Sequence, residues 1–172
     1  MDFLRRSSGE ENGRKIPTYP AATLAFHVAT KGAQLGSCAG LGISVMASVV
    51  SVCLGRKRPE LFRKIMVPFT LLGVGATSGL LYGKHYRNEL DDLGVDDRAY
   101  RIVNNEGQNK VDKYSLGGLL AGALAGVIVG QNFFTLSFAG LALGPCFYKA
   151  EGMYIAYKKS KNVEIYDEKW TK

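Results

Sequence analysis

The chain has 172 residues and a formal net charge of +7 at neutral pH, and this length is sufficient for one domain with a substantial core. Its mean hydropathy of -0.01 is that of an ordinary globular protein. The average hides three blocks without a charged side chain, at residues 35–54, 65–82 and 116–148. Because a bilayer core needs about 20 apolar residues per helix, these blocks indicate a membrane protein and argue against a soluble one.

Residues 1–20 are polar, and we expect them to form a flexible arm ahead of the membrane domain. This segment contains Asp2, Glu10 and Glu11. It therefore lacks the apolar core of a signal peptide and the acid-poor, arginine-rich character of a cleaved mitochondrial presequence. Any organellar targeting information is expected to be internal.

A membrane domain is predicted over residues 21–150, with its first two spans near 33–54 and 65–83. The third apolar block is too long for one helix, because its 33 residues would rise about 50 Å. Gly130, Gln131 and Asn132 form the polar break in this block, so we predict a tight turn there. The last two spans are then expected near 113–130 and 133–150.

These segments predict an all-α membrane protein, a glycine-rich bundle of four transmembrane helices with both termini on the same side. A nearly neutral polar loop, residues 84–112, separates the second and third spans, and we expect residues 86–113 to contact a partner outside the membrane. The charged and aromatic residues 151–172 form a tail.

The short loop between the first two spans is strongly basic, and its cations are candidates for contact with anionic lipid headgroups. They are Arg56, Lys57, Arg58, Arg63 and Lys64. Basic residues in short loops tend to stay on the cytoplasmic side of a membrane, which corresponds to the matrix in a mitochondrion. The termini would then face the intermembrane space. Membrane lipids are thus expected partners, with bound cardiolipin as a plausible lipid, whereas nucleic acid and small-molecule substrates are not expected.

Glycine recurs at four-residue intervals in every predicted span, and residues four apart share one face of a helix. The glycines are Gly32, Gly36 and Gly40 in the first span, Gly75, Gly79 and Gly83 in the second, Gly118, Gly122, Gly126 and Gly130 in the third, and Gly140 and Gly144 in the fourth. Small residues allow helix backbones to approach closely in lipid. These positions are therefore predicted to be helix-packing sites.

The same blocks contain almost no residues suited to catalysis or ion transport. None of the three holds Asp, Glu, Lys, Arg or His, whereas pumps need ionisable residues inside the membrane. The two histidines, His27 and His85, lie near span ends without a neighbouring nucleophile. The three cysteines show no metal-binding spacing. We therefore expect no catalytic residue, no metal site and no cofactor.

The segment VDKYSLGGLLAGALAG, residues 111–126, resembles the start of the third span in the mitochondrial inner-membrane Tim translocase family. That family includes an accessory subunit of respiratory complex I, and the chain is most similar to this branch over residues 28–150. Where the translocase signature carries arginine and then aspartate, this chain has Glu106 and Lys110, which is typical of a divergent member. The resemblance implies a multi-pass protein of the mitochondrial inner membrane.

The resemblance and the uncharged spans together lead to one principal expectation and two alternatives. The principal one is a structural, non-catalytic accessory subunit of complex I that packs against core membrane subunits and supports their assembly. The first alternative is a channel subunit of a Tim-type protein translocase. The second is an accessory subunit of another respiratory assembly, such as ATP synthase.

Overall fold

The computed structural model describes residues 10–11, 14–15, 17–56, 58, 60–130 and 132–170, and this part of the chain is almost entirely helical. The helices are α1 (Pro20–Cys53), α2 (Leu61–Tyr86), α3 (Asp92–Asn104), α4 (Glu106–Val129) and α5 (Phe133–Trp170). Two short strands, β1 (Glu10–Glu11) and β2 (Arg14–Lys15), precede them. The expected all-α class is therefore confirmed for the described residues.

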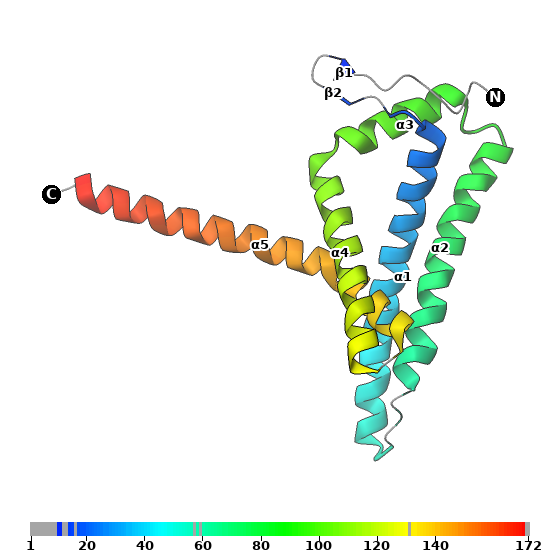
Figure 1. The fold of residues 1–172 in the computed structure, drawn as a ribbon, viewed down its shortest axis with the longest axis vertical. Coiled ribbons are helices and arrows are strands. Elements are labelled where there is room, and N and C mark those ends of the chain that lie inside the picture. Colours follow the sequence, from blue (N-terminus) through cyan, green and yellow to red (C-terminus); the bar gives the residue numbers. More distant parts are fainter. Residues whose placement is uncertain are drawn as a thin grey trace.

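The helices are arranged as two closely packed pairs. The most extensive contacts join α1 to α2 and α4 to α5, and α5 also contacts both α1 and α2. At one end of the bundle α1 ends and α2 begins, and α4 also ends there, close to the start of α5 (Figure 1). The opposite end is covered by α3, which lies across the tops of the other helices.

Three of the described helices, α1, α2 and α4, are long and apolar enough to cross a membrane. Their outer faces carry exposed large apolar side chains, among them Leu35, Leu72, Leu120 and Ile128. Several small hydroxyl side chains, by contrast, are fully buried between helices: Ser37, Ser44, Thr70 and Ser115. Apolar surfaces outside and small polar residues inside are what a lipid environment favours.

The predicted polar loop 84–112 is largely helical. Asp91 caps α3, because its carboxylate accepts a hydrogen bond from the Gly94 backbone N–H at 2.9 Å. Val95 and Ala99, one turn apart, are buried. Val95 forms a small apolar core with Leu24 of α1 and Leu90. This core holds α3 against the end of the α1–α2 pair.

Part of the predicted N-terminal arm is attached to α3. β1 and β2 form an antiparallel hairpin in which Glu10 pairs with Lys15 and Glu11 with Arg14. The side-chain amide of Asn104 donates to the Lys15 carbonyl at 2.9 Å, and its oxygen accepts from the Lys15 N–H at 3.1 Å. Residues 1–9, 12, 13 and 16 lie outside the described residues.

The helix boundaries differ from the predicted spans at two places. α1 begins at Pro20, well before residue 33, because Pro20 occupies the first turn, where proline is tolerated. The predicted fourth span and the predicted tail form one continuous helix, α5. α5 is absent from the described helices that are long and apolar enough to cross a membrane. A fourth span at 133–150 therefore stays a prediction.

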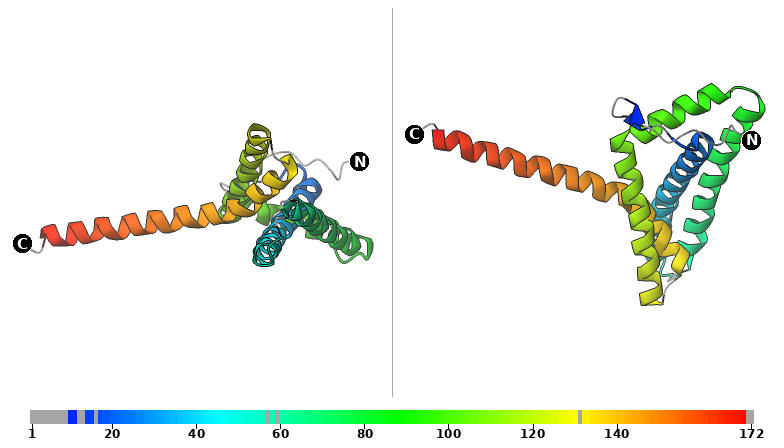
Figure 2. Two further views of the ribbon diagram at one scale, coloured as in Figure 1. Left: turned by 90° about the horizontal axis from the view of Figure 1, so that it is seen from below. Right: turned by 45° about the horizontal axis from the view of Figure 1, so that its top comes forward.

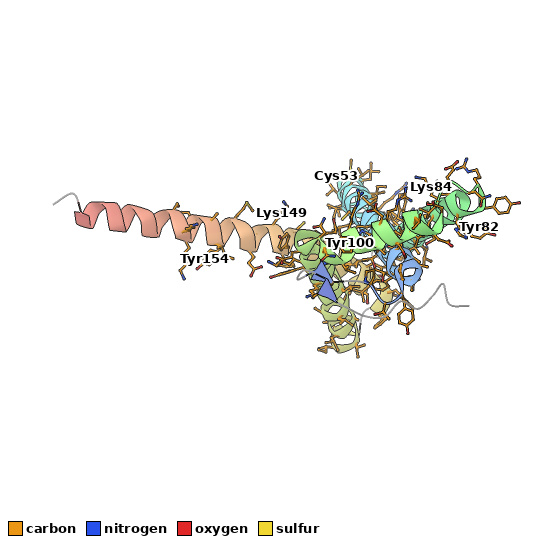
Figure 3. The ribbon with its side chains drawn as sticks, turned by 90° about the horizontal axis from the view of Figure 1, so that it is seen from above. Cys53, Tyr82, Lys84, Tyr100, Lys149 and Tyr154 are labelled. Carbon is orange, nitrogen blue, oxygen red and sulfur yellow. The ribbon has the colours of Figure 1, made fainter. Side chains whose placement is uncertain are left out.

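α5 leaves the bundle after its first part. Pro145 lies inside this helix, where proline removes one backbone hydrogen bond and favours a bend. The remainder projects away from the other helices in all views (Figures 1 and 2), and near its start Glu151 accepts a hydrogen bond from the Tyr114 hydroxyl of α4. Residues 150–160, which we call the α5 arm, are all exposed. Figure 3 labels Tyr154 on the arm and Lys149 directly before it.

Candidate functional site

The first glycine interface joins α1 to α2. A Cβ added to Gly36 would lie 2.9 Å from the Thr70 Cα, and a Cβ added to Gly73 would lie 3.0 Å from the Gly36 Cα. Gly32 faces Gly73 and Thr77, and Gly40 faces Met66 and Phe69. The predicted glycines of α1 therefore lie directly against the backbone of α2.

The glycine of α2 at this interface is Gly73, which is not among the predicted residues. A Cβ added to Gly75, Gly79 or Gly83 would meet no atom within 4 Å in the described structure. Gly75 points away from α1, because Gly73 and Gly75 differ by about 200° around the helix. Four-residue spacing identifies a face but does not show which face is occupied.

The second glycine interface joins α4 to α5, and glycine lies on both sides of it. A Cβ on Gly118 would lie 2.9 Å from the carbonyl carbon of Gly140, and a Cβ on Gly122 would lie 3.1 Å from the Ser137 Cα. Gly126 faces Phe133, and Gly144 faces Ser115 and Tyr114. This close approach extends over three turns of α4.

Gly130 has a different role from the other members of its series. It ends α4 in the left-handed conformation with φ 66°, which glycine adopts without steric cost. A Cβ there would meet no described atom within 4 Å. The predicted break at Gly130 is thus a helix C-cap rather than part of the packing face.

Side-chain hydrogen bonds supplement the first interface. The Ser37 and Thr70 hydroxyls lie 3.0 Å apart, and the Thr77 hydroxyl lies within donating distance of the Val28 carbonyl of α1, at 3.2 Å, and of the Gly73 carbonyl of its own helix, at 3.0 Å. Each links α1 to α2 with polar groups that lipid could not solvate. Such bonds between membrane helices contribute about 0.6 kcal/mol on average. The hydrogen bonds therefore add a modest contribution to the close backbone packing of this interface.

A polar cluster joins α1 to α4 near the α3 end of the bundle. Asp112 of α4 accepts hydrogen bonds from Gln34 at 2.9 Å and from Lys31, and His27 Nδ1 lies 3.2 Å from its second oxygen. Lys31 also donates to the Gln34 side-chain oxygen at 2.9 Å. Gln108 reaches the same carboxylate at 3.4 Å. We call these five residues the Asp112 cluster.

The Asp112 cluster is a contact between the two helix pairs that the sequence predictions missed, although His27 itself was considered. The sequence contains an indication of this polar contact, because His27, Lys31 and Gln34 are spaced by four and three residues and share one face of a helix. The partner carboxylate could not be found this way, since Asp112 is 78 residues from Gln34. The side chain of Asp112 is only 16% exposed, so its charge is satisfied mainly by these partners.

The predicted lipid-binding cations lie around the start of α2. Arg56, Arg58, Arg63 and Lys64 are exposed, and Lys57 lies outside the described residues. Lys64 pairs with Glu60 at 3.0 Å, and this hydrogen bond holds the pKa of the Glu60 carboxyl below its usual range. Arg56 and Arg58 form no ion pair within the part of the chain that the structure describes.

The described residues include no group of three or more His, Cys, Asp or Glu side chains suited to holding a metal ion. A cavity of about 320 Å³ lies between α1, α2 and α3, and its lining is mostly apolar, including Leu24, Leu81 and Val95, with His85 also present. Two of the acidic residues near α3 have local partners. Asp91 caps α3, and Asp97 pairs with Arg101 at 2.8 Å.

A family model described as "Protein of unknown function (DUF1757)" matches residues 1–140. The chain belongs to the DUF1757 family. The match includes α1 to α4 and ends within the first part of α5, so it contains the first glycine interface and the second interface as far as Gly140, whereas Gly144 and the α5 arm lie outside. No curated protein and no solved structure matches the chain.

Proposed function

We propose that this DUF1757 protein is a non-catalytic structural subunit of a large complex in the mitochondrial inner membrane. Respiratory complex I is the host that the sequence resemblance favours. In this proposal α5 provides the fourth span through residues 133–150, the termini face the intermembrane space, and the basic loop before α2 faces the matrix.

The observation that carries the proposal is the α5 arm. Met153, Tyr154 and Ile155 are 57–68% exposed, on a stretch of helix that lies away from the rest of the bundle (Figure 3). An isolated helix of this length is only marginally stable in water, and most helices in proteins depend on packing of an apolar face. A neighbouring subunit would supply that packing.

The two glycine interfaces give further support for a structural role. Their helices are held by direct backbone contact, and in the α1–α2 interface the Ser37, Thr70 and Thr77 hydroxyls are hydrogen-bonded to each other or to the backbone. A rigid bundle of this kind is suited to holding neighbouring subunits at fixed positions. It also leaves the outer apolar faces free for lipid or partner helices.

The test is gentle solubilisation of mitochondria that carry an endogenously tagged chain, followed by native electrophoresis and mass spectrometry. We expect co-migration with NADH dehydrogenase activity and with complex I membrane subunits. Co-migration with protein-import components would replace the proposal with the translocase alternative. Co-migration with ATP synthase would keep a structural role and change the host.

The translocase alternative rests on the hydroxyl groups inside the bundle, which could line a polar path. Ser37 and Thr70 are directed at each other across the α1–α2 interface, however, and Thr70 also donates to the Met66 carbonyl at 3.0 Å. Groups paired in this way are poorly placed to solvate a moving peptide. The structural role is therefore the better supported of the two.

A further inference from the structure

An open groove follows the second half of α1 and ends at the basic loop. Its volume is about 500 Å³. Its apolar lining consists of Ile43, Met46, Ala47, Val50, Leu54 and Leu61, and its polar end consists of Ser51, Arg56 and Arg58. We propose that this groove binds one anionic phospholipid, with an acyl chain along α1 and the phosphate between the two arginines.

The length of the groove matches one leaflet of a bilayer. Ile43 and Leu54 are separated by 11 positions of α1, which corresponds to about 16 Å of helix. Half of a hydrocarbon core is about 15 Å. The residues between them recur at three- and four-residue intervals and therefore form one continuous face. An acyl chain would lie along this face with its headgroup at the loop.

The polar end of the groove is built by the chain reversal after α1. Gly55 adopts φ 68°, a left-handed conformation that turns the chain. The Ser51 hydroxyl donates to the Arg56 carbonyl at 2.5 Å, which ties the loop to the last turn of α1. These two features bring Arg56 and Arg58 to the mouth of an apolar groove.

The charge at this end identifies the occupant. Arg56 and Arg58 are exposed and form no ion pair among the described residues. A guanidinium group presents a planar set of donors that fits a phosphate bidentately. A partner helix would bury the apolar face but leave two cations unmatched, whereas an anionic phospholipid satisfies both parts of the groove. This inference goes beyond the structural role and does not depend on which complex is the host.

The test uses the full chain, purified in a neutral detergent, delipidated and then supplied with phosphatidylglycerol or phosphatidylcholine. Native mass spectrometry counts the lipids retained. We expect one phosphatidylglycerol to be held in clear preference to phosphatidylcholine. The double variant Arg56→Gln/Arg58→Gln should lower that preference about tenfold or more, because each basic side chain near anionic lipid contributes substantially to binding. Equal retention by the variant and the wild type would overturn the proposal.

Two further variants separate this site from general charge effects. Lys84→Gln/Arg98→Gln removes the same charge from exposed residues at the α3 end and should retain phosphatidylglycerol normally. Ala47→Phe fills the groove without changing the charge and should also reduce retention. If Ala47→Phe does not reduce retention, the lipid is held by its headgroup alone, which contradicts the acyl-chain groove. Displacement of the lipid by glycerol phosphate at an equal concentration would lead to the same conclusion.

Discussion

The two helix pairs are held together by the same kind of contact but with different partners. In the α4–α5 pair glycine faces glycine, as at Gly118 and Gly140, and the close approach continues through Gly122 and Gly126. In the α1–α2 pair the glycines of α1 face one glycine of α2, Gly73, and larger residues elsewhere. Hydrogen bonds through Ser37 and Thr77 supplement the glycine contact of the α1–α2 pair.

This difference indicates how each pair should respond to substitution. A side chain added at Gly122 of α4 or at Gly36 of α1 would meet backbone atoms of the facing helix, which cannot move aside without separating the helices. The α1–α2 pair has contacting glycines mainly on α1 and hydroxyl contacts between its helices through Ser37 and Thr77, whereas the α4–α5 pair has contacting glycines on both helices. We therefore expect the α4–α5 pair to be the more sensitive of the two.

The largest effect is expected for Gly122→Leu, which would drive a side chain into Leu136 and Ser137 of α5. We expect a loss of about 3 kcal/mol or more in bundle stability and a marked loss of assembly of the host complex. Thermal unfolding in detergent measures the stability of the bundle, and native electrophoresis measures assembly of the host complex. Resistance to carbonate extraction verifies normal membrane insertion. Gly117→Leu is the matched control, because a Cβ at Gly117 meets nothing within 4 Å. Equal behaviour of the two variants would remove the packing argument for α4.

Substitution in α2 tests which face of this helix packs against α1. Gly73→Leu should destabilise the isolated bundle by about 1–3 kcal/mol, because Gly73 lies against Gly32 and Gly36. Gly75→Leu should leave the isolated bundle unchanged, since its added side chain has open space. Thermal unfolding of the purified variants provides the comparison. A larger effect of Gly75→Leu would show that α2 presents a different face to α1.

The Asp112 cluster should have an intermediate effect. Asp112→Ala leaves Lys31 and His27 without their carboxylate partner, and we expect a loss of about 1–3 kcal/mol. A double-mutant cycle with Lys31→Ala should show clear non-additivity. Asp97→Ala, which breaks an exposed pair with Arg101, is the control and should cost only about 0.3–0.5 kcal/mol. Additive effects of Asp112→Ala and Lys31→Ala would mean that their contact does not connect the helix pairs.

The smallest effect is expected for Ser37→Ala. It removes the hydrogen bond to Thr70 but leaves the Thr70 hydroxyl bonded to the Met66 carbonyl. The expected cost is about 0.6 kcal/mol, to be measured by unfolding in detergent. A cost comparable to that of Gly73→Leu would reverse the ranking of backbone packing over hydrogen bonding in the α1–α2 pair.

The sequence predicted the helical class, the approximate position of the apolar helices and the break at Gly130. These features could be predicted because the absence of charged residues from a segment, and the residues that form a turn, are local properties of the sequence. It did not reveal that Gly73 rather than Gly75 faces α1, since the rotation of a helix depends on its partner. It also missed α3, although Val95, Ala99 and Ile102 recur at helical spacing, because the abundance of charged residues hid that pattern. The Asp112 cluster joins residues distant in the chain, and no local pattern could have predicted its partner.

The most direct test of the structural role is photo-crosslinking from the α5 arm. In one variant a photoreactive amino acid replaces Tyr154, which is 65% exposed on the arm. In a second variant the same amino acid replaces Val49, which is 57% exposed on α1. After irradiation of intact mitochondria, we predict that position 154 captures one defined subunit of complex I in high yield. Capture of lipid alone at position 154, or of import components, would contradict this account.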